Sequence, residues 1–338
     1  MQILSNYSLK KHHTFGTDVY ASYFTEINSI ADFKELQQEA IYKNNTSLIL
    51  GGGSNLLFTK NFEGLVIKNN LHGIEITKQD EDCVFVKAAG GENWHQFVLW
   101  CVNKNYGGIE NLSLIPGCVG ASPMQNIGAY GVEIKDVCFE VNAIDVKTGE
   151  EKTFSNADCK FGYRESVFKH IHKNKYLITS VVFKLNKKPL FNTSYGAIEQ
   201  ELKAMGDKQP SVKAISNAVI NIRSSKLPDP AKVGNAGSFF KNPEVSKQKH
   251  DELKEQFPNL VAYALDNGNY KLAAGWLIEQ CGFKGKRFGD AGVHVNQALV
   301  LVNYGTASGS EIYNLSQQVL DAVQNTFGVT LEREVNIY

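Results

Sequence analysis

Residues 115–131 read IPGCVGASPMQNIGAYG, and this run from Ile115 to Gly131 contains four glycines and two prolines. Glycine is conformationally loose and proline lacks an N–H donor, so the run excludes an ordinary helix or a central strand. Small residues let backbone N–H groups approach a ligand closely, and exposed runs of N–H groups bind phosphate well. The pattern predicts a shaped loop that holds a ligand; a turn-rich connector without a ligand is the alternative.

A second glycine-rich loop, Gly51 to Asn55, follows the short apolar run 48–50, which we expect to be a buried strand. A strand that runs directly into such a loop can present backbone N–H groups to a phosphate. The loop is not the dinucleotide-binding fingerprint, because residues 56–58 continue as an apolar run rather than a helix. A plain hairpin turn is an equally good interpretation of this loop alone.

The chain is long and apolar enough for two or three domains, with 338 residues of which 43% are hydrophobic. Its 35 basic residues balance 35 acidic ones, so no global field favours nucleic acid or a membrane surface. No apolar run approaches the length that spans a bilayer, and the polar segment 1–24 carries no export signal. We therefore expect a cytoplasmic protein without nucleic-acid or membrane partners.

The six cysteines are widely spaced and form no Cys-x-x-Cys pair. That spacing disfavours zinc ribbons and redox dithiols, and reduced thiols are the expectation. The histidines form no His-Glu-x-x-His helix, so no metal site is expected.

Periodicity predicts helices and strands in alternation, which indicates an α+β protein. Two pairs of residues have the spacing of a capping box at the N-terminus of a helix: Ser29 with Asp32, and Ser308 with Glu311. Gly328 follows the end of the last helical pattern. Helices are expected over residues 29–43, 94–103, 197–205, 212–222, 272–281 and 308–327. Strands are expected over 48–50, 65–67, 83–86, 139–146, 151–154 and 176–185, with a strand-like segment at 161–169 and an extended end at 329–338.

Three short segments carry residues that could do chemistry. Ser238 lies between a glycine and two phenylalanines, where aromatic cover would strengthen its hydrogen bonds and let it donate a proton; a turn cap beside core phenylalanines is the alternative. Arg164 could bind a carboxylate or a developing enolate, or pair with Glu165. Glu332 and Glu334 would face the same way in a strand, so spacing cannot choose between them.

Taken together, five motifs closely resemble those of the UDP-N-acetylenolpyruvoylglucosamine reductase family, the flavoenzymes of bacterial peptidoglycan precursor synthesis. The resemblance runs from about residue 14 to residue 335. The motifs are LGGGSNL at 50–56, IPGCVG at 115–120 with QNIGAYG at 125–131, FGYRES at 161–166, NAGSFFKNP at 235–243 and AAGWLI at 273–278.

The resemblance implies an α+β fold with an FAD-binding region of two α+β subdomains, of the FAD-linked oxidase type, plus a third α+β domain that binds substrate. We expect the first subdomain at 1–70, the second at 71–222 joined by the C-terminal segment 329–338, and the substrate domain at 223–328. It also implies non-covalent FAD, NADPH as hydride donor, and reduction of UDP-N-acetylglucosamine enolpyruvate to UDP-N-acetylmuramate. A monomer is expected.

The same resemblance assigns the site residues. The catalytic residues would be Arg164, Ser238 and Glu334, with Glu334 preferred because the family places its carboxylate directly before the valine. The cofactor would be held by Gly51, Gly52, Gly53, Ser54, Asn55, Pro116, Gly117, Gly120, Ala121, Ser122, Asn126, Gly128, Ala129 and Tyr130. The substrate would be bound by Tyr195, Lys226, Asn242, Tyr263 and Gln297, with Arg223 near a phosphate. Tyr195 matches the tyrosine loop of the family's longer subclass.

Two other functions fit parts of this pattern. An oxidase of the related FAD-linked family would react with oxygen and often carries its flavin on a histidine. A nucleotide-sugar binding protein would keep the fold without the flavin. The family resemblance also implies a role for each catalytic residue. Arg164 would neutralise the charge of the enolate, and Glu334 would hydrogen-bond its protonated form. Ser238 would protonate the α-carbon.

Overall fold

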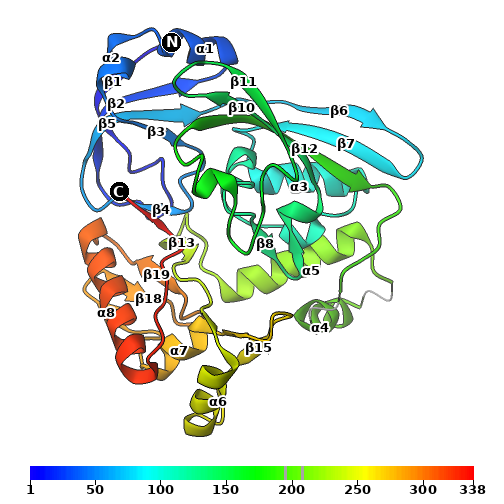
Figure 1. The fold of residues 1–338 in the computed structure, drawn as a ribbon, viewed down its shortest axis with the longest axis vertical. Coiled ribbons are helices and arrows are strands. Elements are labelled where there is room, and N and C mark those ends of the chain that lie inside the picture. The colour runs from blue at the N-terminus through cyan, green and yellow to red at the C-terminus, as the bar shows by residue number, and fades with distance from the viewer. Residues whose placement is uncertain (194–195, 207–208) are drawn as a thin grey trace. The chain divides into compact units, whose positions relative to one another are not determined.

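The computed structural model describes residues 1–193, 196–206 and 209–338. The chain forms two compact units, each built from several segments (Figure 1). Unit 1 comprises Met1–Tyr7, Ala21–Gly52 and Glu63–Ser225, and unit 2 comprises Ser8–Tyr20, Gly53–Phe62 and Lys226–Tyr338. Strands and helices mix in both, which confirms the α+β prediction.

The two larger sheets described for unit 1 have four and five strands. The first has the strand order β1-β2-β5-β3, made of β1 (Leu4–Ser8), β2 (Tyr20–Ile27), β5 (Phe62–Asn69) and β3 (Ser47–Leu50). The second has the order β11-β10-β12-β7-β6, made of β11 (Glu151–Ser155), β10 (Cys138–Asp145), β12 (Tyr176–Asn186), β7 (Cys83–Ala89) and β6 (Ile74–Gln79). β3 runs parallel to β5, whereas the pairs of the second sheet are antiparallel.

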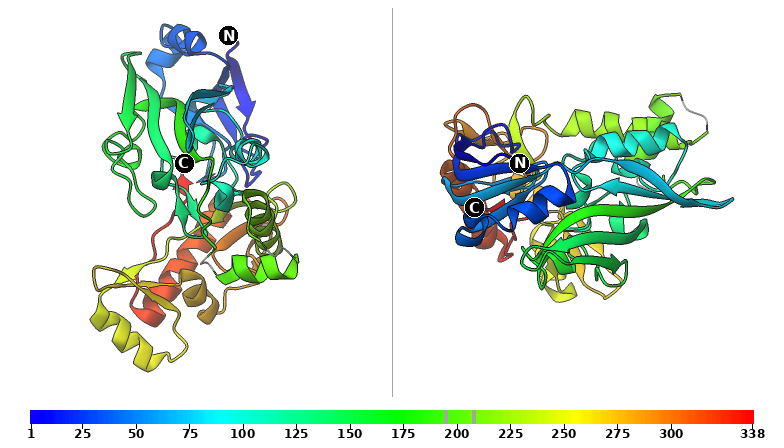
Figure 2. Two further views of the ribbon diagram at one scale, coloured as in Figure 1. Left: turned by 90° about the vertical axis from the view of Figure 1, so that its right-hand side faces the viewer. Right: turned by 90° about the horizontal axis from the view of Figure 1, so that it is seen from above.

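Helix α3 (Trp94–Asn103) packs on the second sheet, and its N-terminus is capped by the side chain of Asn93. The helical spacing of Trp94, Phe97, Val98 and Cys101 predicts that these four residues face inward. This prediction is confirmed, because all four are buried among apolar side chains of β7 and β12. α4 (Gly196–Ala204) and α5 (Val212–Lys226) form a smaller core of their own, in light green at the upper right of the right-hand view of Figure 2.

The predicted helix over 29–43 is wrong as a single helix. The Ser29 capping box is present, but the structure has α1 (Ile30–Leu36) and then α2 (Ala40–Asn44). Between them, the side chain of Gln37 donates hydrogen bonds to the carbonyls of Asp145 and Val146 at 3.3 and 3.0 Å. These long-range bonds fix the chain where the helical pattern would have continued.

Unit 2 is organised around the sheet β13-β19-β18-β17, formed by β13 (Gly234–Ser238), β19 (Val300–Asn303), β18 (Ala291–Val293) and β17 (Arg287–Phe288). The long helix α8 (Gly309–Phe327) packs on it, in red beside β18 and β19 in Figure 1. The predicted box of Ser308 with Glu311 caps α8, and Gly328 ends it at φ 62° in the left-handed region, as predicted.

The rest of unit 2 surrounds this core. It includes α6 (Lys247–Gln256), α7 (Ala274–Gln280), the sheet β14-β16-β15 (Glu244–Val245, Tyr270–Leu272 and Ala262–Ala264) and the pair β20-β4 (Asn336–Ile337 and Leu56–Leu57). β4 pairs with β20, whereas β3 lies in the first sheet of unit 1. The strands on either side of Gly51–Asn55 therefore do not pair with each other, and the hairpin interpretation of that loop is wrong.

Candidate active site

The short glycine loop (residues 51–55) contacts the long glycine loop (residues 115–131) through Gly51 and Gly52, which both belong to unit 1. A Cβ atom added to Gly52 would lie 2.8 Å from the Cα of Gly117, closer than real Cβ atoms approach. Next to it, a Cβ on Gly51 would lie 3.7 Å from the Cβ of Cys118, an ordinary contact. The two loops thus pack backbone on backbone at Gly52, which explains why a side chain is excluded there.

The long glycine loop is held by a third glycine-rich segment at 90–92. Val119 N donates to Glu92 O and Gly120 N to Gly90 O, each at 2.9 Å. The loop then forms a short 3₁₀ turn, η2 (Val119–Ala121), and the hairpin β8 (Gly128–Ala129) to β9 (Val132–Glu133). It is an ordered, hydrogen-bonded loop of the kind that the sequence predicted.

A buried hydroxyl in this loop tests whether a cofactor fits. The Oγ atom of Ser122 is buried and has no hydrogen-bond partner within the described part of the chain. Burying a hydroxyl without a partner is costly, so such an atom is one that a polar ligand would satisfy. The donor chemistry of the loop, a hydroxyl among small residues with accessible backbone, fits the polar groups of a flavin cofactor.

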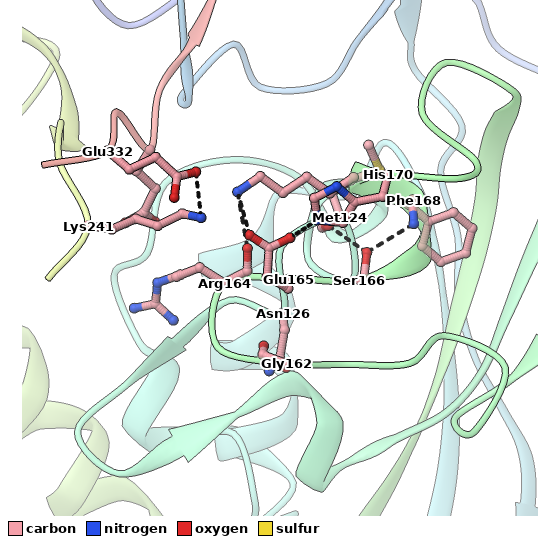
Figure 3. Close-up of polar contacts among 12 residues, drawn as sticks. Met124, Asn126, Gly162, Arg164, Glu165, Ser166, Phe168, His170, Lys241 and Glu332 are labelled. Atoms are coloured by element: carbon pink, nitrogen blue, oxygen red, sulfur yellow. Dashed lines mark hydrogen bonds and ion pairs between the residues drawn. The ribbon is translucent and has the colours of Figure 1, made fainter. Parts of the chain in front are cut away.

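Arg164 lies in a turn of unit 1, not in a strand-like segment as predicted. Gly162 and Glu165 exchange backbone hydrogen bonds at 3.0 and 3.2 Å, and the enclosed Arg164 has φ 56°, which is uncommon for a residue with a side chain. Its guanidinium donates to Gly128 O at 2.8 Å (Figure 3 shows the turn). The side chain is therefore directed at the long glycine loop.

The Glu165 carboxylate has partners of its own. It pairs with Lys169 at 3.4 Å and with the imidazole of His170, as the dashed lines in Figure 3 mark. Lys169 also donates to the carbonyl of Arg164 at 3.2 Å. Lys169 thus contacts both the Glu165 carboxylate and the backbone carbonyl of Arg164.

Ser238 ends β13 in unit 2, and its side chain is exposed. The expected aromatic shielding is wrong, because Phe239 and Phe240 are 0% and 1% exposed and belong to the core. The pairing of β13 with β19 is irregular between Asn235 and Ser238, and such a bulge re-aims a side chain. The bulge presents the hydroxyl outward while both rings point inward.

The C-terminal segment of unit 2 runs antiparallel beside the residues that follow Ser238. Lys241 N donates to Glu332 O at 2.9 Å, and Glu334 N donates to Phe239 O at 2.8 Å. The Glu332 side chain pairs with Nζ of the buried Lys241 at 2.8 Å (Figure 3). Glu332 is thus an exposed partner of Lys241, whereas the backbone of Glu334 lies beside Phe239, the residue next to Ser238.

Three candidate substrate residues lie around one part of unit 2. The Oδ1 atom of Asn242 accepts from Ala274 N at 3.0 Å, where α7 begins. A Cβ on Gly275 would lie 3.2 Å from Oε1 of Gln297, so that side chain reaches the same turn. Tyr263, on the neighbouring strand β15, is 55% exposed. Lys226 is exposed at the end of α5.

Arg223 and His95 both hold Leu114, the residue before the long glycine loop. Arg223 Nε donates to Leu114 O at 3.2 Å, and Leu114 N donates to Nδ1 of His95 at 3.0 Å. Burial lowers the pKa of His95, and the Arg223 charge lowers it further, so a neutral ring accepts this bond. Burial also lowers the pKa of Arg223. Sequence reasoning missed His95, which stands among apolar helix residues without any motif.

The candidate site residues are distributed over the two units as follows. Unit 1 contains Gly51, Gly52, Pro116, Gly117, Gly120, Ala121, Ser122, Asn126, Gly128, Ala129, Tyr130, Arg164 and Arg223. Unit 2 contains Gly53, Ser54, Asn55, Lys226, Ser238, Asn242, Tyr263, Gln297 and Glu334. Tyr195 lies outside the described residues.

Within the described ranges, no group of three or more metal-ligating side chains is present, and all six cysteines are free thiols. No described helix is long and apolar enough to cross a membrane.

The contact between the glycine loops predicts a difference in stability between two alanine variants. Gly52→Ala should lower the free energy of unfolding by about 1–3 kcal/mol, because its methyl group would overlap the Gly117 backbone. The matched variant Gly51→Ala, whose methyl group makes an ordinary contact, should stay within about 1 kcal/mol of the parent. Denaturant unfolding of the flavin-free proteins measures both. Equal losses would contradict the packing described here.

Comparison with known families matches the two parts of the chain separately. Residues 21–155 match the family described as an FAD binding domain. Residues 229–338 match the family described as the C-terminal domain of UDP-N-acetylenolpyruvoylglucosamine reductase.

Whole proteins of the same name align over almost the full chain. The reductase of Flavobacterium johnsoniae is 53% identical over 338 residues and covers 100% of both chains. That of Chromobacterium violaceum is 50% identical over 335 residues, 99% of this chain and 98% of its own. The crystal structure of the Thermus caldophilus enzyme has the same fold, with a TM-score of 0.69, 21% identity, and coverage of 100% of this chain and 98% of that one.

The relatives of about half-identical sequence span 99–100% of the chain, and the two family matches cover residues 21–155 and 229–338. On this evidence the chain belongs to the UDP-N-acetylenolpyruvoylglucosamine reductase family, with an FAD-binding domain in its N-terminal half.

Proposed function

We propose that this chain reduces the enolpyruvyl group of UDP-N-acetylglucosamine enolpyruvate to give UDP-N-acetylmuramate, with NADPH as hydride donor and FAD as a non-covalent cofactor. The observation that carries the proposal is the 53% identity to a named reductase over the full length of both chains. The reaction is an oxidoreduction in the synthesis of peptidoglycan precursors. The comparisons favour it over an FAD-linked oxidase.

The cofactor is proposed to bind at the two glycine loops. Backbone N–H groups at 51–55 and 115–131 suit its diphosphate, and the unpartnered Ser122 hydroxyl suits a polar edge. When bound, FAD supplies the hydride chemistry between NADPH and the terminal carbon of the enol ether. The protein then has to stabilise charge and deliver one proton.

Arg164 is proposed to stabilise the negative charge that hydride addition leaves on the substrate carboxylate. A planar guanidinium binds a carboxylate through two parallel N–H groups. The turn that carries it, closed by Gly162 and Glu165, holds its backbone in one conformation. Such a group stabilises developing charge without having to reorganise.

Ser238 is proposed to deliver a proton to the α-carbon, and Glu334 to hydrogen-bond the protonated form of the substrate carboxylate. The bulge that exposes the Ser238 hydroxyl supports the first assignment, and the backbone bond from Glu334 to Phe239 supports the second. Hydride and proton together complete the reduction of the double bond.

Substrate binding is proposed for the six residues that the family resemblance assigns to it. Asn242, Tyr263 and Gln297 are supported by their common location near the start of α7. Lys226, Tyr195 and Arg223 rest on the family resemblance. We further propose subdomains at 1–70 and 71–222 with 329–338, a substrate domain at 223–328, a monomeric state and a cytoplasmic location.

A product assay tests the proposed function. Purified protein, NADPH and the enolpyruvyl nucleotide should give a nucleotide heavier by one hydride and one proton, in amounts equal to the NADPH consumed. Consumption should persist when oxygen is removed. NADPH oxidation that requires oxygen and leaves the nucleotide unchanged would reject the reductase.

The state of the flavin separates the reductase from the oxidase alternative. After denaturation of the yellow protein, the colour should pass into the filtrate, because the proposed FAD is not covalently attached. Colour retained on the chain would favour an oxidase, and a colourless protein that added FAD cannot reconstitute would favour a nucleotide-sugar binding protein.

Two matched variants test the choice between the C-terminal carboxylates. Glu334→Gln should slow nucleotide reduction by roughly 10²-fold or more, as expected for loss of a group that stabilises the intermediate by hydrogen bonding. Glu332→Gln should change it by less than about 3-fold, because Glu332 is 66% exposed in its pair with Lys241. Single-turnover rates measure both. The reverse order would move the role to Glu332.

A further inference from the structure

We propose that Ser166 and Asn126 are positioning residues that anchor the turn of Arg164 on the long glycine loop. The inference deepens the proposed function and rests on it. Residues 161–166, here called the arginine turn, are joined to residues 124–128 of the long glycine loop by three side-chain hydrogen bonds, all within unit 1. One comes from each of Asn126, Arg164 and Ser166.

Asn126 anchors the beginning of the turn. Its side chain is 0% exposed and donates to Gly162 O at 2.9 Å and to Glu133 Oε2 at 3.0 Å, while its Oδ1 accepts from Lys135 N at 2.9 Å. Only an amide can donate twice and accept once in this space. The Asn126 side chain is thus committed to structure, and its contribution to the cofactor site would come through the loop that it holds.

Ser166 anchors the end of the turn. It is 3% exposed, and its Oγ donates to Met124 O at 2.6 Å (Figure 3). The same Oγ accepts from Phe168 N at 3.2 Å and so caps the short helix η4 (Val167–Lys169). A buried hydroxyl that uses both functions ties the turn to the loop on one side and to the following helix on the other.

Arg164 lies between these two anchors. Its guanidinium donates to Gly128 O, and a Cβ on Gly128 would lie 3.2 Å from Nη1, so the side chain rests against the glycine. Its left-handed backbone, at φ 56°, is intrinsically unfavourable and persists only where the surroundings impose it. Asn126 and Ser166 supply that constraint, and they fix the guanidinium relative to the loop proposed to hold the flavin.

The test is a double-mutant cycle with the two half-reactions measured separately. Ser166→Ala should leave flavin bleaching by NADPH within about 2-fold of the parent and slow recovery of the colour by the nucleotide about 10-fold, the order of one hydrogen bond. In an Arg164→Met background, Ser166→Ala should cause almost no further loss, because its effect passes through Arg164. A serine with only a structural role would slow both half-reactions, or would slow nucleotide reduction equally in the parent and in the Arg164→Met background. Either result would overturn the proposal.

The control is Ser180→Ala, which removes another buried unit 1 hydroxyl, one that accepts from Asn142 at 3.3 Å within the sheet. It should leave both half-reactions within about 2-fold of the parent. If Ser166→Ala does not retain FAD, Ser166→Cys replaces it in the same cycle, since its volume is similar and its S–H is a weak donor. Failure of the proposed function would show differently: the parent protein itself would not recover its colour with the nucleotide.

Discussion

Replacing Ser238 with alanine should slow nucleotide reduction by roughly 10² to 10⁴-fold while flavin bleaching by NADPH stays nearly unchanged. The reason is that the hydroxyl is proposed to supply a proton only after hydride reaches the substrate. Ser238 is exposed at the bulged end of β13 and has no place in the core, so its loss should not disturb folding. Stopped-flow absorbance at the flavin band measures the two half-reactions.

Ser246→Ala is the matched control for this variant. Ser246 is another serine of unit 2, where it caps α6 by accepting from Lys249 N at 3.2 Å. Its replacement should cost about 1 kcal/mol of stability and leave both half-reactions at parent rates. Equal slowing of both half-reactions by Ser238→Ala would remove the serine from the proton-transfer step.

Arg164→Lys should slow nucleotide reduction by roughly 10² to 10³-fold, the range found when one group that stabilises a developing anion is removed. An ammonium group keeps the charge but cannot copy the guanidinium fork, which here also bonds Gly128 O at 2.8 Å. The same stopped-flow experiment applies, with bleaching by NADPH expected to change little.

Arg287→Lys controls for the loss of a guanidinium elsewhere. Arg287 pairs with Asp290 at 2.7 Å on an exposed part of unit 2, and its replacement should leave both rates unchanged. Parent-like nucleotide reduction in Arg164→Lys would show that charge alone suffices, or that Arg164 is not at the reacting group.

Local signals were sufficient for the elements that depend on local chemistry. The capping box and terminal glycine of α8 predicted its limits, because each acts within one turn of the helix end. The apolar spacing of α3 predicted which residues face the sheet. α6 was missed because, among its residues, only Leu253 is buried, so it has no apolar stripe to detect.

Elements that depend on distant residues could not be predicted in this way. The break after α1 depends on Gln37 reaching the end of β10, and the turn of Arg164 depends on Asn126 from another loop. The ion pair between Glu332 and Lys241 could not be predicted either, because the two residues are remote in sequence. The two-residue period of a strand indicates only which face a side chain occupies. It does not identify the side chain that it contacts there.

The central claim, that one flavin passes a hydride from NADPH to the enolpyruvyl nucleotide, is tested most directly by anaerobic double mixing. NADPH is added first, and absorbance at the flavin band should fall. The enolpyruvyl nucleotide is then added without oxygen, and the absorbance should return in an amount equal to the product formed. Colour that returns only when oxygen is admitted would contradict the claim.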